Sequence, residues 1–127
     1  MEYLLDTHAF LWFINGSFEL STQAKNIIQN PENTIYLSIA SFWEIGIKLN
    51  IRKLTIDFSF DELKKEANKN DLRTLPIQFE DIRLFTTLEL YHKDPFDRIL
   101  IAQAMQNNMV MITKDSNFDA YPVKIIW

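Results

Sequence analysis

Four acidic side chains stand beside short apolar segments of this chain: Asp6, Glu44, Asp97 and Asp115. Carboxylates packed together repel one another and raise each other's pKa values, and a divalent cation removes that repulsion. Oxygen ligands in a chain with no cysteine and only two histidines suit Mg²⁺ or Mn²⁺ rather than zinc. If the fold brings these acids together, the sequence therefore predicts a site for a hard divalent cation.

The elements that would position the acids alternate between strand and helix. Short apolar runs predict strands over residues 3–5, 34–38, 72–75, 110–113 and 123–126. Apolar periodicity and capping signals predict helices over residues 7–14, 21–28, 39–52, 59–70 and 79–90, and another that begins at Asp94. Strands this short and apolar, separated by helices, are typical of a mostly parallel sheet covered by helices on both faces. The predicted fold class is α/β, with five strands.

The acids fall where such a sheet places its functional site, beyond the carboxyl ends of the strands. Asp6 is the first residue after strand 3–5, and Asp115 lies two residues after Thr113, the end of the fourth predicted strand. Glu44 lies about one and a half turns into the helix that follows strand 34–38. Asp97 is in the first turn of the helix that leads into strand 110–113. We therefore expect the four carboxylates to converge on one edge of the sheet.

Each acid also has an ordinary structural interpretation. Asp6 can cap the helix at Thr7, and a negative charge at Asp97 suits the positive end of its helix. Glu44 can pair with Lys48, four residues later on the same helix. Asp115 can be a turn residue. These four explanations must hold independently, whereas one metal site accounts for all four positions.

The start of the helix at Asp94 has a clear capping signature. Asp94 can accept hydrogen bonds from the exposed backbone N–H groups, and Pro95 suits the first helical position. The apolar residues that follow give the helix a wide face to bury. Asp94 is therefore expected to act as the cap, and it stays outside the predicted ligand set.

Composition narrows the class of protein. The 127 residues are 47% hydrophobic and include no cysteine, which indicates one globular domain without disulfides or thiolate zinc sites. The start of the chain carries an acid and no basic region, so no signal peptide is expected, and no apolar run approaches the length of a membrane span. We therefore expect a cytoplasmic protein. A net charge of −4 argues against a simple basic nucleic-acid binder, but not against an enzyme that meets phosphate through bound metal ions.

Four motifs in this chain resemble those of the PIN-domain ribonucleases and, more narrowly, of the VapC-type toxins of toxin–antitoxin pairs. They are Leu4-Leu5-Asp6-Thr7-His8, Ser41-Phe42-Trp43-Glu44-Ile45, His92-Lys93-Asp94-Pro95-Phe96-Asp97-Arg98 and Thr113-Lys114-Asp115. The resemblance covers essentially the whole chain. It implies a PIN-like three-layer sandwich and a Mg²⁺- or Mn²⁺-dependent endoribonuclease whose acidic quartet is Asp6, Glu44, Asp97 and Asp115. It also implies a homodimer and a cognate antitoxin that inserts a segment near the acids.

The expected chemistry is the attack of a metal-activated water on an RNA phosphodiester bond. A metal ion held by carboxylates can lower the pKa of a bound water and stabilise charge on the phosphate. Asp6 and Asp97 would be the principal ligands, while Glu44 and Asp115 would complete the shell directly or through water. His8 and His92 do not form an evident pair for metal-free RNA cleavage.

Other residues near the motifs are candidates to bind the substrate. Charge pairing with phosphate supplies affinity for RNA, although any single surface cation can simply keep a protein soluble. Residues next to Asp6 can contact metal-bound water or the substrate. The candidates are Thr7, His8, Lys48, Arg52, Arg98 and Lys114.

Two helices carry many aromatic residues for so small a domain. Core packing explains most of them, and any that remain exposed would mark an interface. The residues are Phe10, Trp12, Phe13, Phe42 and Trp43.

Two alternative functions belong to other classes. A phosphoacceptor receiver domain also places acids at strand ends, but it typically needs an acidic pair after the first strand, where this chain has Asp6 followed by Thr7 and His8. A catalytically silent binding module of PIN fold is the other alternative. The intact quartet argues against that module, and a metal-binding titration separates the two.

Overall fold

Five strands form one sheet in the order β3-β2-β1-β4-β5 in the computed structural model, which describes residues Met1–Trp127. The strands are β1 (Glu2–Leu5), β2 (Thr34–Ser38), β3 (Arg73–Leu75), β4 (Val110–Ile112) and β5 (Ile125–Ile126). Every pairing is parallel, and Leu5 of β1 lies opposite Leu37 of β2 and Ile112 of β4. The predicted five-stranded parallel sheet is confirmed.

Six α-helices and one short 3₁₀ helix connect the strands. They are α1 (Thr7–Asn15), α2 (Thr22–Gln29), α3 (Ile39–Asn50), α4 (Phe60–Lys69), α5 (Phe79–Phe85), α6 (Pro95–Gln106) and the 3₁₀ helix η1 (Ser116–Ala120). Local sequence signals account for most of the helix starts. Ser59 and Glu62 form the predicted capping box at α4, and Asp94 caps α6 with Pro95 in its first turn. No helix is long and apolar enough to cross a membrane.

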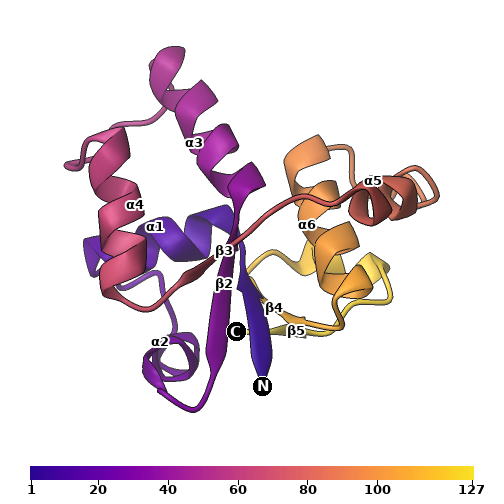
Figure 1. Ribbon diagram of the computed structural model, residues 1–127, viewed down its shortest axis with the longest axis horizontal. Coiled ribbons are helices and arrows are strands. Elements are labelled where there is room, and N and C mark those ends of the chain that lie inside the picture. The colour runs from indigo at the N-terminus through magenta and orange to yellow at the C-terminus, as the bar shows by residue number, and fades with distance from the viewer.

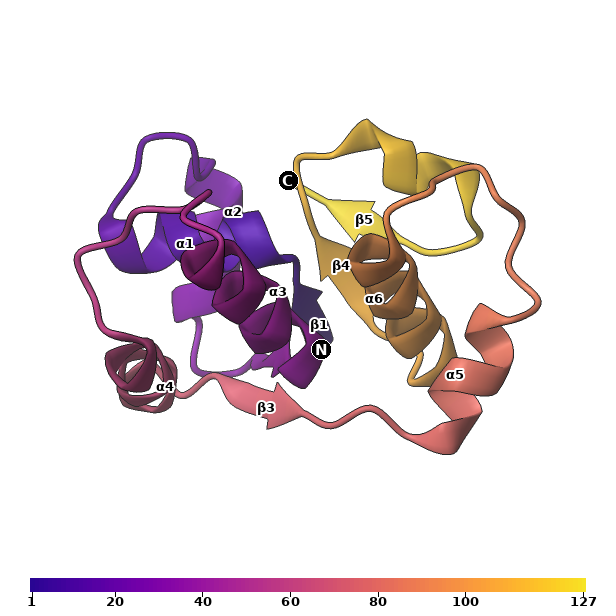
Figure 2. The same ribbon diagram turned by 90° about the horizontal axis from the view of Figure 1, so that it is seen from above.

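Helices cover both faces of the sheet, as Figures 1 and 2 show. Side chains alternate along a strand, so Tyr3 and Leu5 of β1 pack with α1, α2 and α4, whereas Leu4 packs with α6 on the opposite face. Both cores are continuous clusters of buried apolar residues. The α/β class and the layered arrangement are therefore confirmed.

The order of the strands creates a switch point between β1 and β4. From β1 the chain moves outward through β2 to β3, with its helices on one face, and then returns through α5 and α6 on the other face to β4. The loops after β1 and β4 therefore lead in opposite directions, and in folds of this kind ligands bind beside that point, at the carboxyl edge of the sheet.

The structure differs from the sequence prediction in three places. The helix predicted over residues 79–90 ends at Phe85, so the extension to residue 90 was wrong. The last strand is confined to Ile125–Ile126, and the helix η1 after β4 was not predicted. Among the aromatic residues, Phe10 and Phe42 are buried and Trp43 is 63% exposed.

The end of α5 has a local and a tertiary cause. The hydroxyl groups of Thr86 and Thr87 donate to the carbonyl oxygens of Arg83 and Leu84, so they bind backbone groups that would otherwise continue the helix. Beyond them, the guanidinium group of Arg98 donates to the carbonyl oxygen of Leu88. The threonines are a local signal that can be read from the sequence. The contact between Arg98 of α6 and Leu88 depends on tertiary packing.

Candidate active site at the carboxyl edge of the sheet

Asp6 is almost completely buried at the end of β1, with 7% of its surface exposed. One carboxylate oxygen, Oδ1, accepts a hydrogen bond of 2.7 Å from the backbone N–H of Ala9, so the capping interpretation is correct. The other oxygen, Oδ2, accepts a hydrogen bond of 2.5 Å from the hydroxyl group of Thr113. These two hydrogen bonds fix the carboxylate of Asp6 at the switch point. The capping role is therefore compatible with a role in a site.

Thr113 joins two of the predicted site residues. Besides donating to Asp6, its hydroxyl oxygen accepts a hydrogen bond of 3.1 Å from the backbone N–H of Asp115. The Oδ1 atom of Asp115 in turn accepts a hydrogen bond from the backbone N–H of Asn117. Asp115 therefore caps the start of η1. Thr113 was not among the predicted site residues, although its hydroxyl group at a strand end, two positions before an acid, was the available signal.

Asp97 lies in the first turn of α6 and faces the other acids. Asp94 is the cap, as predicted: its Oδ1 accepts from the backbone N–H groups of Phe96 and Asp97. The carboxylate of Asp97 does not cap the helix, and the side chain of Asp97 is 22% exposed. The Oδ2 atom of Asp97 lies 3.0 Å from Nε2 of His92, which is itself 3.7 Å from Oδ2 of Asp115.

Glu44 is buried, with only 4% of its surface exposed. Its Oε2 atom lies 2.9 Å from the ammonium group of Lys48, so the predicted pair is present, but it does not lie on a solvated helix face. The other oxygen, Oε1, is buried without any hydrogen-bond partner. A buried carboxylate oxygen without a donor is costly, and a cation nearby would remove that cost.

Burial and mutual repulsion raise the pKa values of two of these acids. The pKa of Asp97 is raised to about 7, chiefly because burial disfavours its charged form and further because Asp94, Glu44 and Asp6 are negative; His92 opposes the shift. Burial also raises the pKa of Asp6, against the hydrogen bond from Thr113. Perturbed carboxyl groups at a switch point are typical of functional sites.

The donor set fits a hard divalent cation. Ligand atoms of His92, Asp97 and Asp115 lie within 4.8 Å of one another. Asp6 and Glu44 stand outside that set of three, but their charges act on Asp97. Hard oxygen atoms, one unsatisfied carboxylate oxygen and raised carboxyl pKa values together are compatible with a site for a divalent cation.

The cations predicted to bind RNA lie in different surroundings. Lys48 is beside Glu44, and Lys114 is exposed and pairs with Glu19 at 2.8 Å. Arg52 is exposed in the turn after α3, where its φ is +59°. The side chains of Lys48, Lys114 and Arg52 are therefore at least partly accessible to solvent.

Arg98 differs from the other predicted RNA-binding residues because it is buried. Only 8% of its surface is exposed, its guanidinium group donates to Leu88 at 3.0 Å, and it stacks over the ring of Phe85 at 4.4 Å. A contact with the RNA backbone would require Arg98 to leave these partners. Its observed contacts tie the segment after α5 to α6.

The two residues after Asp6 have different surroundings. The hydroxyl group of Thr7 is buried and donates to Ser41 at 2.9 Å, which joins α1 to α3. His8 is exposed, with its ring 5.8 Å from that of Trp12, and its charge lowers the pKa of Asp6. Of the two, His8 has the side chain that faces solvent.

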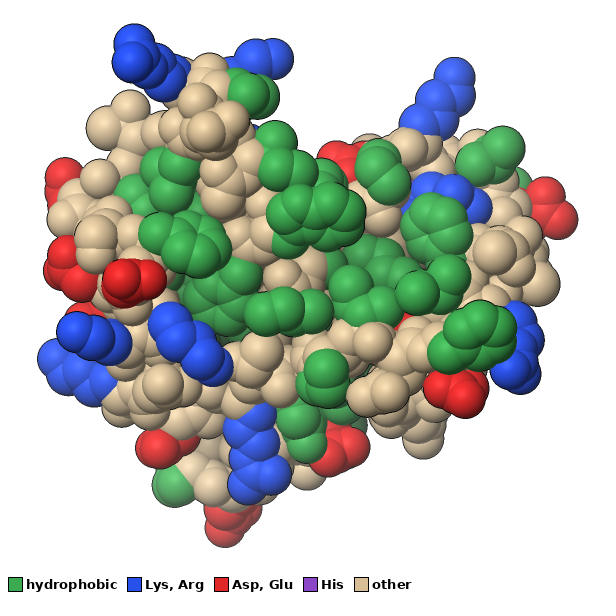
Figure 3. Space-filling view, turned by 45° about the horizontal axis from the view of Figure 1, so that its top comes forward, with side chains coloured by type: hydrophobic (Ala, Val, Ile, Leu, Met, Phe, Trp, Pro, Cys, Tyr) green, Lys and Arg blue, Asp and Glu red, His purple; other side chains and the backbone are tan.

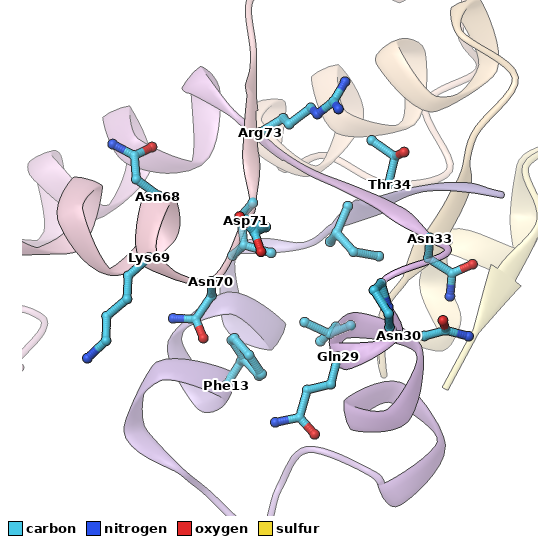
Figure 4. A pocket seen from close by; sticks show the side chains of 14 residues that line it. Phe13, Gln29, Asn30, Asn33, Thr34, Asn68, Lys69, Asn70, Asp71 and Arg73 are labelled. Atoms are coloured by element: carbon cyan, nitrogen blue, oxygen red, sulfur yellow. The ribbon is translucent and has the colours of Figure 1, made fainter.

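A large hollow lies away from the acids, at the amino ends of β2 and β3. It has a volume of about 650 Å³ and is lined mainly by polar residues that include Asn30, Asn33, Asn70 and Arg73, as Figure 4 shows. None of the four acids lines it. The amide groups of Asn33 and Asn70 donate to backbone carbonyl groups of their own segments. The predicted acidic site therefore lies away from this hollow.

The raised carboxyl pKa values predict how stability depends on pH in the absence of metal. Between about pH 4, the ordinary carboxyl value, and about pH 7, the pKa of Asp97, the folded state binds more protons than the unfolded state. The contribution of Asp6 and Asp97 to the free energy of unfolding should therefore fall as pH rises through that range. We expect the melting temperature in a chelator to drop by several degrees relative to the Asp6→Asn/Asp97→Asn variant between about pH 5 and about pH 8. Parallel curves for the two proteins would contradict the shifts.

The fold and the acidic edge define an α/β protein with carboxylates gathered at a switch point. A family model described as PIN domain matches residues 3–124, so the chain belongs to the PIN domain family. No curated protein sequence matches the chain.

Several solved structures share the fold. VapBC2 from Rickettsia felis, solved with a DNA fragment from its promoter, has a TM-score of 0.71 at 15% identity, and the match covers 99% of this chain and 98% of that chain. A toxin–antitoxin complex from Klebsiella pneumoniae has a TM-score of 0.68 at 19% identity, covering 98% and 96%. The toxin VapC20 from Mycobacterium tuberculosis, described as cleaving the sarcin-ricin loop, has a TM-score of 0.67 at 12% identity, covering 95% of each chain. The arrangement of the chain is therefore that of these proteins.

Proposed function

We propose that this protein is a Mg²⁺- or Mn²⁺-dependent endoribonuclease and the toxin of a toxin–antitoxin pair. The observation that carries the proposal is the gathering of Asp6, Asp97, Asp115 and the unsatisfied Glu44 at the carboxyl edge, where burial raises the pKa of Asp97. Membership of the PIN domain family supports nuclease chemistry. The description of VapC20 as a toxin that cleaves the sarcin-ricin loop supports RNA as the substrate class.

Each acid has a role that follows from its position. Asp6 and Asp97 would hold the ion from opposite sides of the switch point, and Glu44 and Asp115 would complete its surroundings. Thr113 fixes the orientation of Asp6 by donating to Oδ2. The bound ion supplies charge stabilisation at the phosphate and lowers the pKa of water.

We infer that the cations that remain accessible bind the RNA backbone. Lys48 lies beside Glu44, Lys114 follows Thr113 directly, and His8 lies close enough to Asp6 to affect its pKa. Positive charges around an acidic centre bind the phosphates on either side of the scissile bond. The hydroxyl group of Thr7 donates to Ser41, which joins α1 to α3 beside Asp6, and a contact of Thr7 with the substrate stays a prediction.

Cleavage of single-stranded RNA by the purified chain tests the proposal. We expect cleavage in Mg²⁺ or Mn²⁺, arrest by a chelator, and a rise in melting temperature on addition of either ion by mass action. Tight metal binding without cleavage of any RNA would favour a silent binding module instead. If the chain does cleave RNA, sequencing the RNA ends produced after pulse expression would identify the target.

We further propose that the chain acts as a homodimer and binds a cognate antitoxin. The solved relatives described as toxin–antitoxin complexes support an antitoxin partner. An apolar face between α3, α5 and α6 supports the dimer: Trp43, Ile82 and Phe79 are 63%, 48% and 66% exposed, and Figure 3 shows the apolar side chains gathered over this face. Trp43 and Ile82 also line an apolar hollow of about 270 Å³. A cytoplasmic location stays a prediction.

The dimer is tested by one substitution on this face. Trp43→Glu should convert a dimer into a monomer, because it places a charge in the middle of an apolar interface. Light scattering measures the mass, and Phe18→Glu is the matched control because Phe18 is fully exposed elsewhere. A wild-type chain that is monomeric at micromolar concentration would refute the homodimer.

A further inference from the structure

His92, for which the sequence predicted no role, lies close to two of the acids. It lies in the segment between α5 and α6, and its side chain is 16% exposed. Its Nε2 atom is 3.0 Å from Oδ2 of Asp97 and 3.7 Å from Oδ2 of Asp115. These carboxylates come from different elements, α6 and the loop after β4, and His92 is the side chain that lies close to both.

The imidazole ring is held in place from several directions. The backbone N–H of His92 donates to the hydroxyl oxygen of Tyr121 at 3.0 Å, and that hydroxyl group donates to the carbonyl oxygen of Glu89 at 2.6 Å. The ring packs edge-on against Phe118 of η1, with 6.0 Å between ring centres. The segment that carries His92 is therefore tied to η1 and to the residue after it, close to Asp115.

The hydrogen bond at the other ring nitrogen decides what His92 can do. Nδ1 accepts from the backbone N–H of Asp94 at 3.3 Å, so the proton of a neutral ring is on Nε2. A nitrogen that carries a proton has no free lone pair for a metal ion. Nε2 is shielded from solvent and forms no hydrogen bond in this structure, and the nearest carboxylate acceptor is Oδ2 of Asp97, 3.0 Å away.

We propose that His92 is a positioning residue that donates from Nε2 to Asp97, with Asp115 3.7 Å away, and so sets the spacing between these two carboxylates. The inference rests on the proposed function only in taking the two acids as metal ligands. An N–H donor close to both carboxylates offsets the repulsion between them, and its hydrogen bond orients one oxygen of Asp97. Outer residues that orient metal ligands typically contribute about 10–100-fold to metal affinity.

Three substitutions separate this role from direct metal binding and from plain packing. His92→Gln can return an amide N–H toward Asp97, where Nε2 stood. His92→Asn can keep an acceptor for the backbone N–H of Asp94 but places nothing at Nε2. His92→Phe keeps a ring against Phe118 and removes both nitrogens.

The measurement is Mn²⁺ affinity, by calorimetry or electron paramagnetic resonance, without any RNA. We expect Asn and Phe at position 92 to weaken Mn²⁺ binding by about tenfold or more, and Gln to restore most of it. Equal losses in all three variants would overturn the positioning role in favour of a direct ligand. Unchanged affinity in all three would overturn it in favour of packing alone.

Nitrogen NMR of the metal-free protein tests the tautomer directly, and only His8 and His92 contribute histidine signals. We expect the proton of His92 on Nε2, and this signal should persist when Mg²⁺ is added. A proton on Nδ1, or a proton lost from Nε2 on adding Mg²⁺, would overturn the inference. Neither readout needs turnover, so a chain that binds metal but leaves RNA intact would refute the nuclease proposal while leaving this one standing.

Discussion

Asp97→Asn is expected to lower metal-dependent RNA cleavage by orders of magnitude while leaving the protein folded. Asn removes a charged hard ligand but keeps a polar side chain in the first turn of α6. It also removes a carboxylate whose pKa is raised to about 7, so the melting temperature at neutral pH should stay the same or rise. Cleavage of a labelled oligoribonucleotide and thermal unfolding measure the two effects.

Asp94→Asn is the matched control for this prediction. It alters one carboxylate in the same stretch, but Asn caps a helix about as well as Asp. The hydrogen bonds to the backbone of Phe96 and Asp97 should therefore survive. We expect Asp94→Asn to cleave RNA far faster than Asp97→Asn. Equal losses would place Asp94 in the site, and full activity of a folded Asp97→Asn protein would remove Asp97 from it.

Glu44→Gln should be nearly inactive and should require more Mg²⁺, because it removes negative charge beside the proposed ion. Glu44 is buried and one of its oxygens has no donor, so losing its charge should cost little stability or increase it. Lys48→Ala tests the alternative that the two residues only stabilise α3. It breaks the 2.9 Å pair but leaves the carboxylate, so turnover at saturating RNA should stay close to wild type.

Single-turnover cleavage with enzyme in excess and Mg²⁺ varied compares the two variants. Lys48→Ala leaves the buried carboxylate of Glu44 without the ammonium group that Oε2 binds, so this variant should also lose stability, whereas Glu44→Gln should not. RNA affinity is the property that Lys48→Ala should weaken. If both variants lose a similar small factor in rate, Glu44 serves α3 rather than the site and the acidic set shrinks to three.

Local signals in the sequence determined the elements and their sites of initiation. Ser59 and Glu62 cap α4, and Asp94 with Pro95 begins α6, because capping needs only neighbours within a few residues. The short apolar strands predicted a parallel sheet since such strands are buried on both faces. The placement of Asp6 and Asp115 near strand ends then followed from the general geometry of α/β sheets.

Contacts between distant segments decided the rest, because they depend on how helices pack and not on local spacing. Arg98 was predicted as a cation that binds RNA, but it is buried against Phe85 and Leu88. Its hydrogen bond to the carbonyl oxygen of Leu88 lies beyond the end of α5, in the segment that was predicted to be helical to residue 90. The link from Thr113 to Asp6 spans 107 positions. His92 reaches Asp115 only because Tyr121 and Phe118 hold it there. Sequence alone predicted the carboxylates, whereas the groups that contact them, Thr113 and His92, could be recognised only from the packing of α6 and η1 beside β1.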